Sequence, residues 1–152
     1  MTAEPGKQEV IMMRTFDATC ELVFKAHMDP NAIPKWWGRK NSTTTVDRME
    51  VREGGRWRFV ERTADGGDYG FHGVYHAIVA PERIVQTFEF EGVPGHVILE
   101  TLTLVEQGGV TTLTSHSVYQ SVEDRDGMVQ SGMEDGANES MDRLAELLGR
   151  MT

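Results

Sequence analysis

Five histidines are the residues of this sequence whose chemistry best suits metal binding or proton transfer near neutral pH. His72 and His76 are spaced to lie on one face of a strand, but four steps of about 3.3 Å place them roughly 13 Å apart. Bonds from zinc to nitrogen are about 2 Å long, so these two rings cannot share an ion. We therefore predict no metal site, and no motif of the chain indicates a cofactor.

A catalytic acid–base pair is not visible either. His116 lies in a segment that reads as a strand and could hydrogen-bond to a ligand, although a partly exposed strand histidine is the plainer interpretation. Tyr75 could play the same part. The acidic residues gather in EDRD, MEDG and RTADGGD, which are typical of helix caps and turns, and the paired glycines lie in hairpin turns without a following helix. We predict no catalytic residue.

Charge and cysteine content restrict the partners and the compartment. The chain has 152 residues and a net charge of −9. Binding to nucleic acids or to anionic membranes needs a basic surface, so we expect neither as a partner. Cys20 is the only cysteine, which excludes an intrachain disulfide and fits a reducing compartment. The N-terminus has no basic start followed by an apolar stretch. We expect a single cytoplasmic domain over 1–152, with Cys20 as a small buried side chain.

Trp36 and Trp37 stand next to each other, and adjacent residues cannot face the same way in a helix or a strand. We expect Trp37 to close the end of the core near Trp57, and Trp36 to lie at a cavity edge or on the surface. Two explanations remain open. Both rings could be wedged between a short helix and the sheet, or the pair could form the lip of a site for an apolar guest or a partner protein.

These residues must be positioned by a predictable order of elements. The patterns predict a strand over 8–16, a helix over 18–28, a short helix ending near Gly38, and a short and a long helix over 123–130 and 133–149. Between 42 and 120, turn motifs about every ten residues predict six strands in an antiparallel meander. Ser121 and Asp124 resemble a capping box. The stretch HVILETLTLV has apolar residues at both odd and even positions. This pattern suggests that the strand has a bulge or that both of its faces are buried.

One arrangement buries the apolar faces of all these elements. Strands such as RWRFVER alternate apolar and charged residues, so one face of the sheet is exposed to water. The long C-terminal helix carries the only apolar stripe extensive enough to cover the other face, and the sheet must curl around it. If the sheet is wider than one helix can fill, a hollow remains between them.

The C-terminal helix has a face of small residues beside an apolar one. Gly132, Gly136 and Ser140 recur every four residues next to Met133, Ala137 and Met141. An interior glycine costs a helix about 1 kcal/mol relative to alanine, so some contact should offset this cost. Either the sheet approaches closely there, or the space belongs to a ligand.

The sequence resembles the Aha1-type domains, named after activators of the heat-shock-protein-90 ATPase, within the START-like or polyketide cyclase (SRPBCC) helix-grip superfamily. The resemblance covers residues 8 to 149 and rests on motifs that include FDATCELVFKAHMDPNAIPKWWG, REGGRWRF and SGMEDGANESMDRLAELL. It implies an α+β helix-grip fold, in which a curved antiparallel sheet of about seven strands wraps a long C-terminal helix around an apolar cavity. Many relatives carry a tryptophan in a GWEQSLDRL-like run, where this chain has Gly136-Ala137-Asn138.

Three functions follow as hypotheses. The first is binding of an unidentified small apolar or aromatic molecule. The second, implied by the resemblance alone, is regulation of a chaperone ATPase, and the third is a reaction of the polyketide cyclase or aromatase kind; a stress-linked role or a homodimer is also compatible with such domains. The predicted ligand-binding residues are Trp37, Trp57, Phe59, Phe71, Tyr75, Phe88, Leu113, His116, Met133 and Ala137.

Overall fold

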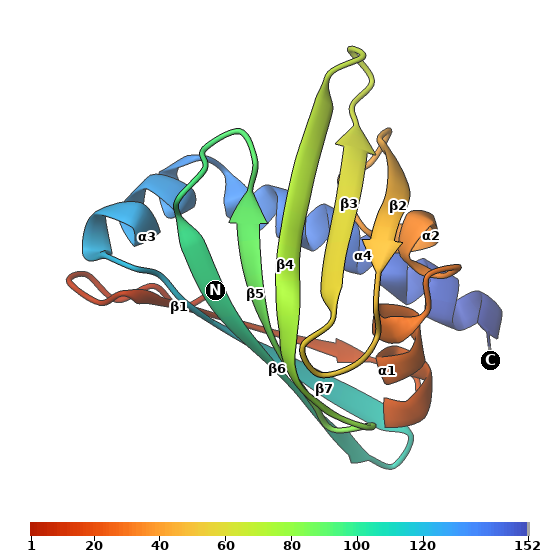
Figure 1. Ribbon diagram of the computed structural model, residues 1–152. Coiled ribbons are helices and arrows are strands. Elements are labelled where there is room, and N and C mark those ends of the chain that lie inside the picture. The colour runs from red at the N-terminus through yellow and green to blue at the C-terminus, as the bar shows by residue number, and fades with distance from the viewer. Residues whose placement is uncertain (152) are drawn as a thin grey trace.

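The protein, described over residues 1–151 by a computed structural model, is built on one seven-stranded antiparallel sheet in the order β1-β7-β6-β5-β4-β3-β2 (Figure 1). The predicted element order is confirmed. The strands are β1 (Glu9–Phe16), β2 (Thr43–Met49), β3 (Arg56–Arg62), β4 (Asp68–Val79), β5 (Arg83–Phe90), β6 (Val97–Gln107) and β7 (Val110–Val118). The helices are α1 (Cys20–Met28), α2 (Ile33–Trp36), α3 (Val122–Gln130) and α4 (Met133–Met151).

The sheet curls, and α4 runs across its concave face (Figure 1). Register shifts interrupt the β2–β3 pair at Val46/Arg48 and the β4–β5 pair at Tyr75/Ala77, and such bulges bend strands and increase their twist. At Gly73 the strands β4 and β5 approach so closely that a Cβ atom would lie 1.9 Å from the carbonyl oxygen of Thr87. Only glycine fits at this point of the bend.

Side-chain caps and one glycine set the helix ends. The hydroxyl of Thr19 accepts from the backbone N–H of Leu22 at the start of α1, and Ser121 accepts from the N–H of Asp124 at 3.0 Å at the start of α3. The second contact confirms the Ser121 half of the predicted capping box, while the Asp124 carboxylate contacts His96. Between α3 and α4, Gly132 adopts φ +84°, a left-handed conformation that glycine takes without strain. The C-terminal helical segment therefore divides at Gly132, while Gly127 lies inside α3.

The main core lies between one end of the sheet and α1, α2 and the second half of α4. Leu144, Leu147 and Leu148 of α4 are buried there, and Cys20 is buried as predicted. The first half of α4, from Met133 to Met141, contains only half-buried or exposed residues. The long helix is therefore embedded along one half of its length.

Strand β6 corrects one reading of the sequence. Its pairings with β5 and β7 are continuous, so it has no bulge, and it is covered on one face only. Leu99 and Val105 point outward with 43% and 53% of their surface exposed, while Ile98 and Leu104 are buried. Because apolar residues occur at both parities, the sequence pattern could not show which set faces the core.

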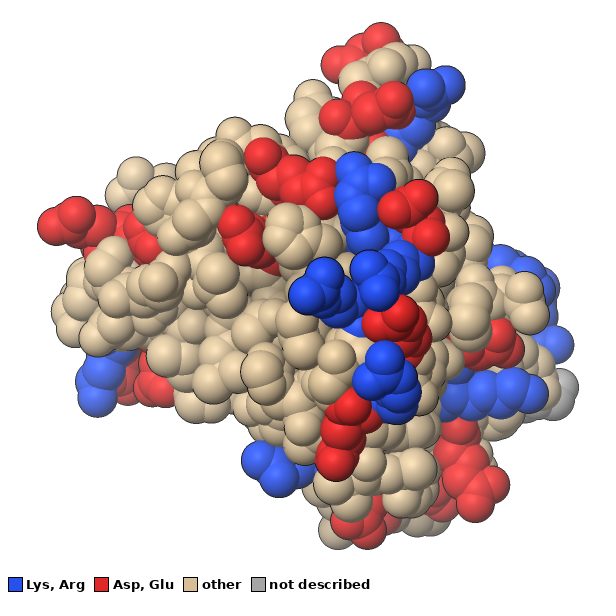
Figure 2. All heavy atoms as spheres, in the orientation of Figure 1, with Lys and Arg blue, Asp and Glu red and all other residues tan. Residues whose placement is uncertain are grey.

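Charged side chains of both signs are interleaved on the outer face of the sheet, mainly over β2 to β4 (Figure 2). Arg58 contacts Glu91 and Asp47, and Arg62 contacts Asp68. The carboxylates hold the pKa of both guanidinium groups above its ordinary value. Acidic side chains thus separate the basic ones on this face. Among the described residues, no helix is long and apolar enough to span a membrane.

Candidate ligand cavity

A cavity of about 780 Å³ lies between the concave face of the sheet and the first half of α4. Its walls come from the inward positions of six strands, from α1 and α2, and from α3 and α4. The lining is mostly aromatic and aliphatic, with three methionines from the C-terminal helices at one side: Met128, Met133 and Met141. The hollow arises where the sheet extends beyond the buried half of α4.

Nine of the ten predicted binding residues line this cavity. These are Trp37, Trp57, Phe59, Phe71, Tyr75, Phe88, Leu113, Met133 and Ala137. The tenth, His116, does not: it has the opposite parity from Leu113 on β7, and its Nε2 lies 2.5 Å from a carboxylate oxygen of Glu9 on the outer side. His116 is therefore corrected to a surface residue, as the plainer interpretation proposed.

The burial predicted for the two adjacent tryptophans is reversed, although both line the cavity. Trp36 is the buried ring, only 3% exposed; its Nε1 donates to the carbonyl of Ala26 at 2.9 Å, and its ring lies against His27. Trp37 is half-buried and stands in the cavity. The prediction failed because Trp36 ends helix α2 and faces α1, whereas Trp37 is already in extended backbone and turns toward the sheet.

Aromatic rings form a connected wall along β3, β4 and β5. Trp37 meets Phe59 and Phe71 edge-on, with ring centroids 5.2 and 5.1 Å apart. Phe71 in turn contacts Phe88 at 5.4 Å, and Trp57 contacts Phe59 at 4.8 Å. Edge-to-face and tilted arrangements of this kind are favourable beyond the area they bury, so these contacts stabilise the wall.

The small face of α4 receives the loop that follows the tryptophan pair. A Cβ atom on Gly136 would lie 2.9 Å from the guanidinium carbon of Arg39, and this guanidinium donates to the carbonyl of Gly132. The backbone N–H of Gly38 donates to Ser140 at 3.2 Å. Glu61 holds the same loop from β3 by accepting from the N–H of Arg39 at 2.7 Å. Gly136 therefore makes room for the Arg39 side chain of this loop, and not for the sheet.

The same segment of α4 also borders the cavity. Gly136, Ala137 and Asn138 all line it. Their small side chains leave space that a large ring would occupy. The exposed residues Arg39, Tyr69 and Asn138 line one end of the cavity, so it opens to solvent between α4 and the ends of the strands.

Gln86, Glu100 and Ser117 are polar residues of the cavity that were missed in the sequence. Glu100 on β6 faces inward, where Gln86 Nε2 of β5 donates to its Oε1 at 3.0 Å. Burial raises the pKa of Glu100 above its ordinary value and also raises the pKa of Tyr75. Burial raises the pKa of Tyr119 to about 12, and Glu100 adds to this rise whenever it is ionised. A clear alternation in β6 would have identified Glu100, but that strand has apolar residues at both parities.

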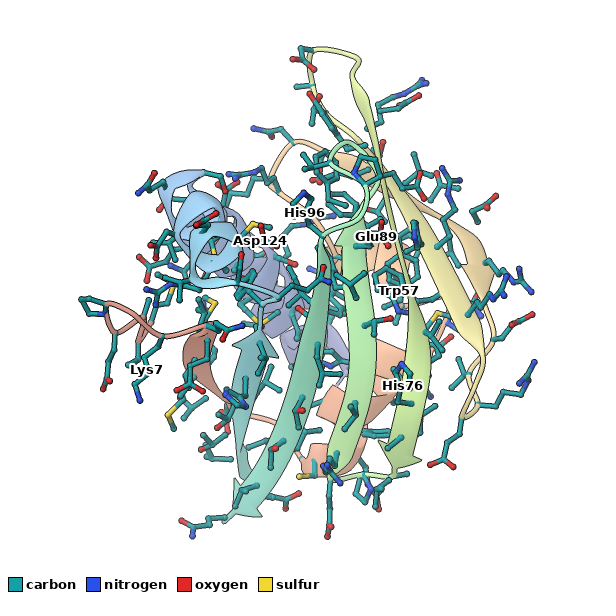
Figure 3. The ribbon with its side chains drawn as sticks, turned by 60° about the vertical axis from the view of Figure 1, so that its left-hand side comes forward. Lys7, Trp57, His76, Glu89, His96 and Asp124 are labelled. Atoms are coloured by element: carbon teal, nitrogen blue, oxygen red, sulfur yellow. The ribbon has the colours of Figure 1, made fainter. Side chains whose placement is uncertain are left out.

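A side-chain contact joins the β5–β6 loop to α3. His96 Nδ1 lies 2.9 Å from Asp124 Oδ2, and Figure 3 shows the two side chains pointing toward one another. His72 and His76 lie on the outer side of β4, where His72 contacts Glu91. Among residues 1–151, no group of three or more His, Cys, Asp or Glu side chains is arranged to hold a metal ion.

Comparison with known proteins identifies the family. The sequence model described as Activator of Hsp90 ATPase homolog 1-like protein matches residues 17–149. The chain belongs to this family. Its fold is accordingly the helix-grip arrangement of START-like proteins, as the sequence motifs predicted. No curated protein matches the chain in a sequence comparison.

Solved structures from bacteria share this fold. A Rhodobacter sphaeroides protein is 26% identical, with a TM-score of 0.87 and coverage of 98% of this chain and 97% of its own. A family member from Silicibacter pomeroyi is 19% identical, with a TM-score of 0.79 and coverage of 95% and 99%. DynU16, from the dynemicin biosynthetic locus, is 22% identical with a TM-score of 0.73; the match covers 94% of this chain and 48% of DynU16.

Proposed function

We propose that the protein binds a small apolar or aromatic molecule in the cavity between the sheet and α4. The observation that carries this proposal is the cavity itself. Its volume of about 780 Å³ lies within the range of about 300–1,000 Å³ that is typical of small-molecule sites. A largely apolar hollow of this size leaves its lining side chains without packing partners on one side, and an apolar guest would supply them.

The composition of the wall supports the same ligand class. Rigid aromatic rings on the sheet side offer flat surfaces for stacking, and Met133 and Met141 on the helix side are flexible and polarizable enough to adapt to different shapes. Trp37 stands at this wall with both of its aromatic contacts inside the cavity. Its fluorescence should therefore report binding directly.

The test uses N-phenyl-1-naphthylamine, an uncharged aromatic probe whose emission rises in apolar surroundings. We expect it to bind the wild-type protein and to raise its melting temperature; at a free probe concentration of a hundred times Kd the stabilisation is about 2.7 kcal/mol. Ala137→Trp should fill the cavity and abolish probe binding without lowering the melting temperature. The matched control is Ala145→Trp on an exposed position of the same helix, which should leave probe binding unchanged.

The proposal fails if the probe does not bind the wild type while Ala137→Trp raises the melting temperature. Such a result would mean that the hollow is a packing defect that the protein's own side chains can fill.

Regulation of a chaperone ATPase is the second candidate, and it is favoured by membership of a family named after an activator of the Hsp90 ATPase. The net charge of −9 could match a basic surface on such a partner. The test is a pull-down with the heat-shock-protein-90 homologue of the same organism, followed by ATPase rates with and without this protein. Unchanged rates would dismiss this candidate and would leave ligand binding unaffected.

A cyclase-type reaction gains two polar groups from the structure, Tyr75 and Glu100, which both line the cavity. Within the described residues, neither side chain hydrogen-bonds to the other, so they do not form an acid–base pair. We therefore propose binding and no reaction.

A further inference from the structure

Four polar residues form a continuous row across the inner face of the sheet. Tyr75 of β4 pairs with Gln86 of β5, Gln86 pairs with Glu100 of β6, and Glu100 pairs with Ser117 of β7. All four line the cavity. Neighbouring strands are about 4.8 Å apart, so the row extends over roughly 14 Å of an otherwise apolar surface. A polar band of this kind is unusual on the buried face of a sheet and calls for partners.

Most of the hydrogen-bonding capacity of this row is unused by the protein. Gln86 donates to Glu100 Oε1, but among residues 1–151 no partner contacts Glu100 Oε2, the hydroxyl of Tyr75 or the hydroxyl of Ser117. Tyr75 is 2% exposed and Ser117 is 7% exposed, so bulk water does not surround them. The two hydroxyls and Glu100 Oε2 face the cavity, so a ligand with matching polar atoms would take the place of water beside them.

The surroundings of Glu100 favour its uncharged form. No basic side chain of the described residues lies within ion-pair distance of Glu100. Arg125 lowers the pKa of the neighbouring Tyr119 through its charge. The guanidinium group of Arg125, however, contacts Asp126 and the carbonyl oxygens of Glu4 and Glu9. Burial raises the pKa of Glu100. Because Oε1 accepts from Gln86, the proton of the neutral acid belongs on Oε2, the oxygen without a protein partner.

We propose that the row makes the cavity selective for uncharged ligands that carry a carbonyl or similar accepting oxygen, with Glu100 as the hydrogen-bond donor to that oxygen. This inference rests on the proposed function and adds the polar chemistry of the ligand to it. An amine ligand would need the opposite state of Glu100, an ionised carboxylate paired with the ammonium group. Among the described residues Glu100 forms no ion pair and hydrogen-bonds only to the neutral Gln86, which favours the neutral acid.

Three ligands with the same ring system distinguish these possibilities: fluorene, which is wholly apolar, fluorenone, which adds one carbonyl oxygen, and 9-aminofluorene, which adds an amine. Their affinities are measured by displacement of N-phenyl-1-naphthylamine. We expect the wild type to bind fluorenone about three- to tenfold more tightly than fluorene, as one net hydrogen bond provides. 9-Aminofluorene should bind no better than fluorene.

Two substitutions assign the preference to Glu100. Glu100→Gln keeps a donor group and should retain the preference for fluorenone, whereas Glu100→Leu should abolish it and leave the affinity for fluorene equal or higher. Glu146→Gln on the exposed side of α4 is the matched control, because Glu146 makes no hydrogen bond or ion pair within residues 1–151. Circular dichroism spectra check that each variant is folded.

The outcomes separate this inference from the function on which it rests. Equal binding of all three ligands, unaffected by Glu100→Leu, would overturn the inference and keep the cavity as an apolar binding site. Tighter binding of 9-aminofluorene that Glu100→Gln abolishes would also overturn it, in favour of a cation site. No displacement by any ligand, together with no binding of the probe, would overturn both.

Discussion

Glu100 shows what a single side chain adds to an apolar cavity. It occupies an inward position of β6, its only protein partner among the described residues is Gln86, and burial raises its pKa. The sequence could have indicated a buried acid only if the face of β6 had been known. That face is set by the register with β5 and β7, which a pattern with apolar residues at both parities does not determine.

The stability of the protein should depend on the ionisation of Glu100. Its pKa in the folded protein is raised above 4.5, so folding favours the protonated form. The destabilisation that ionised Glu100 causes is absent below the pKa that Glu100 has in the unfolded chain. It develops as the pH rises through the pKa that Glu100 has in the folded protein. We expect the melting temperature of the wild type to fall relative to that of Glu100→Gln over this rise in pH. A constant difference between the two proteins would contradict the prediction, and Glu146→Gln serves as the control.

Trp36 and Trp37 should differ in their contributions to stability. Trp36→Phe removes a buried hydrogen bond to Ala26 and leaves that carbonyl unpaired, so we expect a loss of about 2 kcal/mol in the free energy of unfolding. Trp37→Phe shortens a half-buried ring in the cavity and should cost less than about 1 kcal/mol, because it leaves no buried donor or acceptor unpaired. Urea denaturation measures both values, and equal losses would show that the two rings are packed alike.

At the scale of elements, the sequence predicted which segments form but not where all of their faces point. Turn motifs and caps depend on a few adjacent residues, so the six-strand meander and the Ser121 cap were recognisable. The contact that explains the small face of α4 joins Arg39 and Gly136, which are far apart in the chain. A pattern within one helix shows that space exists, but not which distant loop fills it.

Two glycines of the C-terminal helices should respond in opposite ways to alanine. Gly127 lies inside α3 with open space around its Cβ position, so Gly127→Ala should stabilise the protein by about 0.5–1 kcal/mol. Gly132 has equally open space but φ +84°, so Gly132→Ala should destabilise it by about 1–2 kcal/mol. Thermal denaturation compares the two variants. A change of the same sign in both would mean that backbone conformation does not control the break between α3 and α4.

At the scale of the whole molecule, the sequence predicted the architecture and most of the cavity wall. Six strands between residues 42 and 120 require a wide sheet, and a single long helix with one apolar stripe cannot cover it completely. Nine predicted residues line the resulting hollow for this reason. The polar row was not predictable, because it exists only once four strands are placed in register.

The uneven burial of α4 has a consequence for the motion of the protein. Leu144, Leu147 and Leu148 fix its second half in the core, whereas the first half covers a hollow and is attached to the loop after Trp37 by polar contacts of Gly132, Glu139 and Ser140. We expect the backbone amides of the first half to exchange with deuterium much faster than those of the second, although one helix contains both. A ligand in the cavity should slow this exchange. The deuterium uptake of peptides from α4, measured by mass spectrometry, would therefore distinguish the ligand-bound protein from the empty one.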